Sequence, residues 1–389
     1  MKARYKYITM VLCLIMVVAC ETPENPVYDS SNPDPNPPGT PAATVTGVIP
    51  AAALPGKTVS VMGSGFNTNP SANLVSFGPN AATVTSATTT QLDVTVPLAS
   101  GAVDVKVGVR GSVNWSNEVP FVIESFIPDI ANPVVETIDE EIVWPMGVAV
   151  DASGNVYVGS ANDEVIYQIT PAGEKSEFAS VPVVGHIHFG PEGYLYVSEK
   201  WEGKIVRISP DGTTIEDVAE VSDAGDFDWD ENGNMWILSI DYGVFVMSPG
   251  GSPTEVLGDM GSVKNLRVFD GYLYVSNIWD QILTRHEING TSLGEAEEYL
   301  SIDDSGPSSF DFDENGVMYY AYAWETSLYV YAPGGAEEAL FYEEELETPM
   351  RYMYYHGDKI YIVFPGWADV GKVISVYIGV NQAPRYGMQ

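Results

Sequence analysis

A repeat of about 40 residues fills the last two-thirds of the chain. Each copy has an aromatic residue in the second of its short apolar runs. A turn rich in Asp, Gly and Asn precedes this residue, and a third extended run follows it. Successive aromatics lie 39, 40, 38, 45 and 42 residues apart, and they are Tyr157, Tyr196, Trp236, Tyr274, Tyr319 and Tyr361. Short strands at this period are typical of a β-propeller, in which each copy forms one four-stranded sheet. The sequence therefore predicts an all-β fold with six blades over residues 125–389.

The first copy carries the most regular motif, Pro145-x-Gly147-Val-Ala-Val-Asp151-x-x-Gly154-Asn155-Val-Tyr157-Val. This motif resembles the NHL repeat, which the later copies follow more loosely. The sixth copy ends after its third extended run, near Ile378. An open edge strand invites pairing with another chain. We therefore expect residues 133–138 to supply the missing outer strand of the sixth blade and to close the ring.

Residues 1–19 have the layout of a lipoprotein signal peptide. Three basic residues precede an apolar run, from Ile8 to Ala19, that is too short to span a bilayer. The run ends in Val17-Val18-Ala19-Cys20, which resembles a bacterial lipobox and thereby implies lipidation of Cys20. The alternative is an ordinary secretory signal in which this cysteine is incidental. Residues 20–43 are rich in Pro, Asn, Ser and Thr, and they predict a lipid-anchored, extended tether.

Residues 44–124 predict short strands at 58–61, 74–77, 92–96 and 103–107, separated by Gly, Pro, Asn and Ser. The motifs in this stretch are Val59-x-Val61-x-Gly63-x-Gly65-Phe66, Val75-x-Phe77-Gly78, Val96-Pro97 and Ser116-Asn117-x-x-x-Phe121. They resemble an IPT/TIG domain, which implies an Ig-like β-sandwich acting as a spacer or interaction module. No catalytic constellation occurs here, so Trp115 is interpreted as a packing residue.

The charge balance limits the classes of molecule that this protein can bind. The chain has 53 acidic and 17 basic residues, which give a formal net charge of -36. Such a surface repels nucleic acid and anionic membranes, so we expect no nucleic-acid partner and membrane contact only through the lipid anchor. Because Cys13 lies in the predicted signal peptide, the mature chain keeps one cysteine. This count excludes a disulfide, and we expect no thiol nucleophile.

Two sets of residues are expected on one face of the propeller. The loop after the repeated aromatic carries a large ring in five copies and Asn162 in the first, while polar residues open the first strand of most copies. Rings bind at low conformational cost, and loops tend to carry function. A sugar could place its apolar face on an indole and its hydroxyls on the polar groups. The candidate ligand-binding residues are Trp144, His186, Trp201, Asp226, Tyr242, Asn265, Arg267, Trp279, Ser309, Trp324, Arg351 and Trp367. The alternative is that the rings only pack between blades.

Polar residues expected at the centre of the propeller could form a metal site or an acid/base pair. His186 and His188 alternate on one predicted strand, and Asp226 and Asp228 alternate on the next, so these four are candidate metal ligands. No spacing motif fixes a metal geometry, which favours a hydrated polar lining instead. Asp226 could also form an acid/base pair with Asp311. The sequence contains no serine elbow, Walker loop or HExxH motif, and we expect no catalytic residue, metal or other cofactor.

Together, the lipobox, tether, IPT/TIG domain and NHL-like propeller resemble a Bacteroidetes outer-membrane lipoprotein of a polysaccharide-utilisation system. The resemblance implies a non-catalytic glycan-binding protein, lipid-anchored in the outer membrane and facing the cell exterior. Its partners would be a polysaccharide or oligosaccharide, an outer-membrane importer and surface glycan-degrading proteins. The alternatives are a propeller enzyme, either a lyase or a lactone hydrolase, and a protein-binding scaffold. Two arginines in the channel hint at an acidic sugar, although the net charge weighs against one.

Overall fold

The structure is a computed structural model that describes residues 41–97, 99–125, 134–181, 185–199, 202–301, 306–322, 326–332, 338–343, 349–366 and 369–386. The chain forms two compact units, Met1–Ser125 and Phe126–Gln389, and each is described by itself. The predicted signal peptide, Cys20 and most of the predicted tether lie outside the described residues. Among the residues that are described, no helix is both long and apolar enough to cross a membrane.

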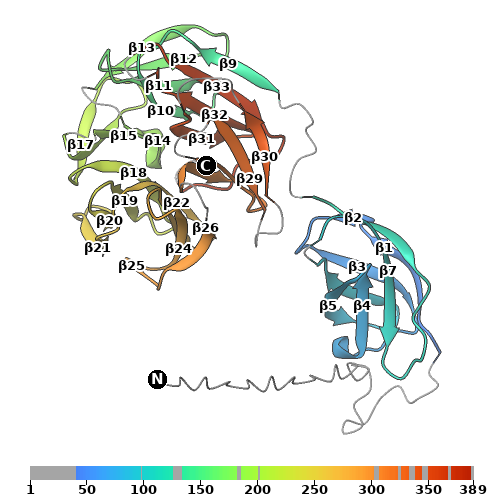
Figure 1. Cartoon of the computed structure of the whole chain (residues 1–389). Helices are drawn as coiled ribbons and strands as arrows, with labels where there is room; N and C mark the ends of the chain where they lie inside the picture. The colour runs from blue at the N-terminus through green and yellow to red at the C-terminus, as the bar shows by residue number, and fades with distance from the viewer. Residues whose placement is uncertain are drawn as a thin grey trace, which may run out of the picture. The chain divides into compact units, whose positions relative to one another are not determined.

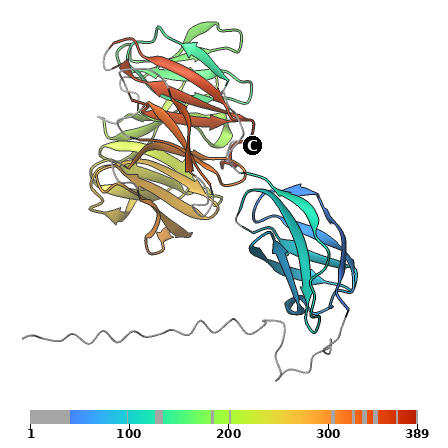
Figure 2. The ribbon, with the colours of Figure 1, turned by 45° about the vertical axis from the view of Figure 1, so that its right-hand side comes forward.

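The smaller unit is an Ig-like β-sandwich (Figure 2). One sheet contains β1 (Thr44–Ile49), β3 (Thr58–Ser64), β6 (Gln91–Thr95) and β5 (Asn80–Ala87); the other contains β4 (Asn73–Phe77), β7 (Gly101–Val109), β8 (Val119–Ile123) and β2 (Ala52–Ala53), and the short helix η1 (Pro70–Ala72) precedes β4. Strand β5 joins the sheets, because its first residues pair with β4 and its later residues pair with β6. The alternating apolar residues predicted from the sequence, such as Val61, Phe77 and Val105, fill the core between the two sheets.

The closing motif of this domain fastens the first strand to the last. The Asn117 side chain accepts a hydrogen bond from the Val45 amide at 3.0 Å and donates one to the Val45 carbonyl at 2.8 Å. Next to it, Ser116 Oγ accepts from the Val107 amide at 2.9 Å. Trp115 is 42% exposed, and the Lys106 ammonium lies 5.5 Å from its ring centroid. The motif residues therefore have a structural role.

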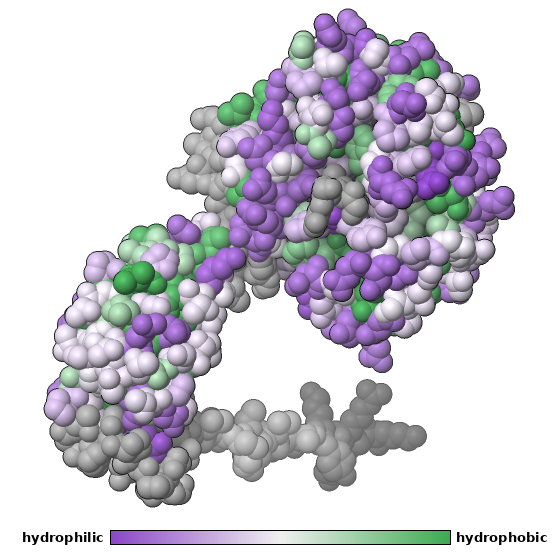
Figure 3. All heavy atoms as spheres, turned by 180° about the vertical axis from the view of Figure 1, so that it is seen from behind, coloured by the Kyte–Doolittle hydropathy of each residue, from purple (hydrophilic) through white to green (hydrophobic). Residues whose placement is uncertain are grey.

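The larger unit is a β-propeller whose described residues form six sheets around one centre (Figure 1). Blade one has β10 (Pro145–Val150), β11 (Val156–Ser160), β12 (Val165–Ile169) and β13 (Lys175–Ser180); blade two has β14 (Ile187–Phe189), η2 (Pro191–Gly193), β15 (Leu195–Glu199), β16 (Lys204–Ile208) and β17 (Ile215–Glu220); blade three has β18 (Ala224–Trp229), β19 (Met235–Ser239), β20 (Gly243–Met247) and β21 (Thr254–Gly258). Blade four has β22 (Val263–Phe269), β23 (Tyr272–Asn277), β24 (Ile282–Asn289), β25 (Ser292–Leu293) and β26 (Glu297–Ser301); blade five has β27 (Pro307–Phe312), β28 (Met318–Tyr322), β29 (Ser327–Tyr331) and β30 (Glu338–Glu343); blade six has β31 (Tyr352–His356), β32 (Lys359–Phe364), β33 (Lys372–Tyr377) and β9 (Val135–Asp139). Hydrophilic side chains cover much of the propeller surface seen in Figure 3.

The ring closes as the repeat predicts. Strand β9 pairs antiparallel with β33 and supplies the outer strand of blade six, which confirms the expected closure of the ring with a strand over Val135–Asp139 in place of residues 133–138. Blade four explains the longest spacing in the repeat. Its third strand, β24, continues into a small hairpin with β25 before β26 adds to the sheet. The extra residues therefore lengthen the edge of this blade and leave the ring unchanged.

The repeated aromatics are core residues that pack between blades. All six are less than 9% exposed. The Tyr157 ring meets Phe189 of blade two with centroids 5.1 Å apart, and Tyr196 meets Trp229 of blade three at 4.7 Å. Offset and edge-to-face contacts of this kind add to the area that the rings bury. The aromatic recurs because each blade needs it to pack against the next.

The turn before each aromatic explains the repeated Asp and Asn. In blade three, Asp230 Oδ1 accepts the amides of Asn232 and Asn234, while Oδ2 accepts the Asn234 side-chain amide and Trp236 Nε1 at 2.9 and 3.1 Å. Blade five differs because Val317 replaces the second Asn. Oδ2 of Asp313 is buried there and has no hydrogen-bond partner among the described residues. Burial raises the pKa of Asp313 to about 6.

We expect Asp313→Asn to stabilise the protein at pH 8 by about 1–3 kcal/mol. Because the folded-state pKa of Asp313 is raised, ionisation of its carboxyl costs stability above about pH 6. This cost disappears as the pH falls to about 4, so the difference between variant and wild type should shrink there. Urea denaturation at pH 8 and pH 4 measures it. The matched change Asp230→Asn should destabilise, since its amide would face the donors of Asn234 and Trp236. An equal effect of the two variants would contradict the burial argument.

Candidate functional site

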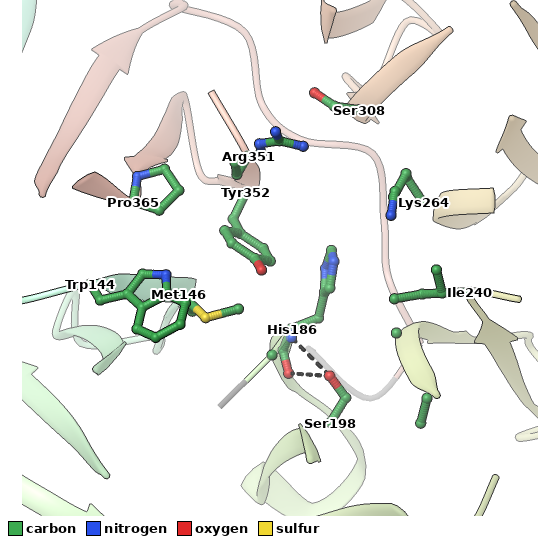
Figure 4. Close-up of a pocket in the computed structure, with 13 residues that line it drawn as sticks. Trp144, Met146, His186, Ser198, Ile240, Lys264, Ser308, Arg351, Tyr352 and Pro365 are labelled. Carbon is green, nitrogen blue, oxygen red and sulfur yellow. Dashed lines mark hydrogen bonds between the residues drawn. The ribbon is translucent and has the colours of Figure 1, made fainter. Parts of the chain in front are cut away.

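A cavity of about 290 Å³ opens at the centre of one end of the propeller, where the innermost strands begin (Figure 4). Every blade contributes to it. The lining residues are Trp144, Met146, Gly185, His186, Ser198, Ala224, Gly225, Ile240, Lys264, Ser308, Arg351, Tyr352 and Pro365. Trp144, His186 and Arg351 are candidates from the sequence. A concave site with a few converging polar groups is the arrangement that small ligands use.

Trp144 lies in the wall of this cavity, on an unusual backbone conformation. Its backbone has φ of 47°, in the left-handed region that bulky residues rarely adopt. Two hydrogen bonds maintain this conformation: the Trp144 amide donates to the Asp369 carbonyl at 2.8 Å, and its carbonyl accepts from the Ala161 amide at 3.1 Å. Backbone strain persists only where the surroundings impose it, and such residues cluster at ligand sites. The backbone that carries the indole is therefore fixed by the surrounding loops.

Bulges in the innermost strands decide which side chains face the cavity. The pairing register shifts in β10, β18, β22 and β27, in each case near the start of the strand. A bulge adds one residue and redirects the side chains beside it. Lys264 and Ser308 consequently line the cavity, whereas their neighbours Asn265 and Ser309 are buried away from it. The sequence did not predict Lys264 or Ser308. A repeat of about 40 residues does not reveal where the register of strand pairing shifts by one residue.

Below the cavity, two histidines converge on one carboxylate. His188 Nε2 lies 2.7 Å from Asp226 Oδ1, and His186 Nδ1 lies 3.2 Å from the same oxygen. Burial lowers the pKa of His188, and Asp226 only partly opposes this effect. Burial alone would raise the pKa of Asp226, but the two imidazoles hold it well below its usual range. His186 faces the cavity, and its ring meets Tyr352 edge-on with centroids 4.9 Å apart.

Three of the four candidate metal ligands meet at this point. His186, His188 and Asp226 each offer one ligand atom, and these atoms lie within 4.8 Å of one another. Asp228 does not join them, because its Oδ2 accepts from Arg267 Nη1 at 2.6 Å and from the Val268 amide at 2.9 Å. The Asp226 oxygens already accept bonds from His188, Asn265 and backbone amides. This arrangement matches a hydrogen-bonded lining.

Acidic and amide side chains of the centre join blades three, four, five and six in succession. Asp226 Oδ2 accepts from the Leu266 amide at 3.0 Å, and Asp228 Oδ2 accepts from the Val268 amide at 2.9 Å, so blade three holds blade four. Asn265 Oδ1 accepts from Phe310 N in the same way, and Asp311 Oδ2 accepts from Tyr355 N. Each bond joins two innermost strands. Asp226 and Asn265, which the sequence suggested as ligand contacts, thus form hydrogen bonds between blades.

Arg267 and Arg385 neutralise the deepest carboxylates. Arg267 is 1% exposed and does not line the cavity; its Nε lies 2.9 Å from Asp311 Oδ1 and its Nη1 2.6 Å from Asp228 Oδ2. Arg385, from the C-terminal tail, pairs with Asp311 at 2.5 Å. Burial alone would raise the pKa of Asp311, but Arg385 and Arg267 lower it below its usual range. Asp226 and Asp311, considered above as an acid/base pair, therefore belong to separate hydrogen-bonded clusters.

The tail that carries Arg385 lies against the opposite end of the propeller. The Ala383 amide donates to the Phe312 carbonyl at 2.9 Å, and the Gln382 amide donates to the Gly357 carbonyl at 2.7 Å. Tyr386 lies beside the turn at Gly233. The turns between first and second strands are at this end, so the tail and the cavity lie on opposite faces. No repeat signal predicted the tail, because it lies after the last copy.

The predicted aromatic rim is only partly described. Tyr242 and Trp279 are 54% and 68% exposed, and both follow second strands at the end of the propeller where the cavity opens. Neither lines the cavity. The other predicted rim residues, Trp201, Trp324 and Trp367, lie outside the described residues. Tyr352 and Met146 line the cavity and were not predicted; burial raises the pKa of Tyr352 to about 12, so its hydroxyl remains a donor.

Comparisons with known proteins support both units. Residues 43–123 match the IPT/TIG domain, which confirms the resemblance seen in the sequence. No curated protein matches the chain. A solved auxiliary nutrient binding protein from Bacteroides thetaiotaomicron is 12% identical; the similarity covers 89% of this chain and 100% of that one, with a TM-score of 0.53. A second auxiliary nutrient binding protein, from Bacteroides ovatus, is 14% identical over 88% and 99% of the two chains, with a TM-score of 0.52.

A gluconolactonase from Xanthomonas campestris is also similar, with 13% identity, a TM-score of 0.56, and coverage of 64% of this chain and 90% of its own. At these identities, the solved structures show the fold alone. The chain therefore carries an IPT/TIG domain followed by a six-bladed β-propeller.

Proposed function

We propose that this protein is a non-catalytic glycan-binding protein that takes the end of a polysaccharide or oligosaccharide into the central cavity of its propeller. The observation that carries the proposal is the Trp144 ring in the cavity wall, beside polar groups from several blades. An indole can stack on the apolar face of a sugar, and Ser198, Ser308 and Tyr352 offer hydroxyls to its polar groups. The cavity is small, near the lower end of the ~300–1,000 Å³ typical of ligand pockets. It suits one or two sugar rings.

The rest of the chain suggests where this binding takes place. The lipobox-like sequence and the proline-rich stretch after it support a lipid-anchored protein of the outer membrane that faces the cell exterior. Two Bacteroides proteins of similar fold are described as auxiliary nutrient binding proteins, which supports a role in capturing a nutrient. The partners would then be an outer-membrane importer and surface glycan-degrading proteins, which receive the captured chain.

A glycan array on the chain without its first 20 residues tests this proposal. We expect binding to a restricted class of glycans, and retardation of the protein in gels that contain the corresponding polysaccharide. Products should not accumulate on prolonged incubation with a bound glycan. If no glycan binds, the proposal is wrong, and a protein-binding scaffold becomes the better interpretation.

A second candidate function is an enzyme, a lyase or lactone hydrolase. The contact of His186 with Asp226 favours it, because a carboxylate can orient an imidazole that faces a cavity for proton transfer. Chromatographic assay for products from bound glycans and from sugar lactones, with metal analysis of the purified protein, separates the two functions. Turnover that His186→Ala abolishes, or activity lost in a chelator with a stoichiometric metal, would favour the enzyme.

A further inference from the structure

The C-terminal tail, residues 380–386, forms hydrogen bonds with two blades although it belongs to neither. The Asn381 carbonyl accepts from the Glu314 amide of blade five at 2.8 Å. The Val380 carbonyl accepts from the Tyr355 hydroxyl of blade six at 2.7 Å. These bonds add to the two main-chain bonds between the tail and the same blades that are described above. The tail therefore bridges blades five and six.

Arg385 gives the tail a second attachment, in the buried centre of the propeller. It is 7% exposed, and its guanidinium lies 2.5 Å from Asp311 of blade five and 3.8 Å from Asp228 of blade three. Arg267 of blade four also reaches the tail, because its Nη2 donates to the Pro384 carbonyl at 3.4 Å. The tail thus contacts blades three, four, five and six.

The charged cluster at this end is balanced only while the tail is in place. Asp228 and Asp311 carry its negative charges, Arg267 and Arg385 carry its positive charges, and all four residues are less than 9% exposed. Without Arg385, two buried carboxylates would share one guanidinium. A buried charge without a partner is costly, because it has lost water and gained nothing in return. The tail therefore supplies half of the positive charge of this cluster.

The cluster lies on the same innermost strands that begin at the cavity. On β18, β22 and β27, each cluster residue lies three positions after a residue of the cavity lining. These pairs are Gly225 and Asp228, Lys264 and Arg267, and Ser308 and Asp311. Three residues of a strand span about 10 Å. Groups that hold the cluster in place therefore also hold the strands that lead to the cavity.

We propose that residues 380–386 form a clasp, which docks as one unit on the six blades and inserts Arg385 to balance the buried cluster on β18, β22 and β27. This clasp is a conformational device of the fold and does not depend on which ligand the cavity binds. Proteins open locally in cooperative units. The main-chain bonds of the clasp are expected to break together, because the tail cannot leave the blades unless Arg385 leaves the centre.

Hydrogen exchange of the full chain tests the clasp. In Arg385→Met, the amides of Glu314, Gln382 and Ala383 should exchange ~10-fold or more faster than in the wild type, since a buried ion pair has lost one partner. Amides of β15 and β16 in blade two should keep their rates. The control is Arg207→Met, which removes the same charge from an ion pair on the outer part of blade two and should leave the tail amides unchanged. Unchanged tail amides in Arg385→Met would overturn the proposal, and so would equal acceleration in every blade.

A double variant tests the charge balance itself. Arg385→Met and Asp311→Asn should each lower the urea midpoint of the propeller, because each leaves one buried charge unbalanced. The two changes together restore equal numbers of opposite charges, so the double variant should have a higher midpoint than either single variant. Additive losses would contradict the role of Arg385. If Arg385→Met does not fold, a folded double variant supports the proposal and an unfolded one overturns it.

Discussion

Arg267→Met is expected to lower the free energy of unfolding of the propeller by about 3–5 kcal/mol. Arg267 lies between two buried carboxylates, with Asp228 2.6 Å and Asp311 2.9 Å from its guanidinium. Removal of one partner from a buried ion pair leaves a charge without compensation, which costs more than the intact pair contributes. Arg385 still reaches Asp311 at 2.5 Å, but its distance to Asp228 is 3.8 Å. Asp228 is therefore the buried carboxylate that loses its close charged partner in the variant.

Urea denaturation followed by tryptophan fluorescence measures this loss. Seven of the eight tryptophans lie after residue 125, so the signal reports on the propeller separately from the sandwich. The control is Arg207→Met, which removes a pair with Glu216 on the outer part of a blade. An exposed pair of this kind contributes about 0–1 kcal/mol. A loss below about 1 kcal/mol in Arg267→Met would show that the charged cluster does not hold the ring together.

Trp144→Gly is expected to weaken glycan binding by about 30-fold or more, the cost of removing a central aromatic that carries a binding site. Glycine suits this position because φ is 47°, a value that glycine adopts without strain. The variant therefore removes the ring and leaves the local backbone favourable. Calorimetry with the best array ligand gives the affinity, and melting curves show whether the fold is retained.

Trp279→Ala is the matched comparison for this experiment. Trp279 is 68% exposed at the same end of the propeller but lies outside the cavity, so its loss should change affinity by less than about threefold. The opposite order, with a large effect of Trp279 and a small effect of Trp144, would move the site from the cavity to the outer rim.

The fold could be predicted because it depends on patterns that the sequence repeats. The spacing of Tyr157, Tyr196 and the later aromatics defines the blades, since each blade must bury one ring against the next. The early end of the sixth copy predicted that β9 would complete its sheet. The IPT/TIG motifs were equally informative, because Asn117 and Ser116 make bonds that hold the sandwich closed.

The site was less predictable, because it depends on single-residue register and on contacts between distant segments. Counting from the repeated aromatic placed Asn265 and Ser309 at the site, but bulges in β22 and β27 present Lys264 and Ser308 instead. The pairing of Arg267 with Asp311 was also hidden, since 44 residues separate them in sequence.

The sequence by itself thus determined the architecture: the IPT/TIG motifs predict the sandwich, and the period and turns of the repeat predict the six blades. Only the tertiary structure decided which polar groups are structural and which face a ligand. Asp226 and Arg267 look available in sequence, yet their hydrogen bonds join neighbouring blades, whereas Trp144 and Arg351 line the cavity. The physical reason is that side chains alternate between opposite faces along a strand, so one inserted residue reverses which of them is exposed.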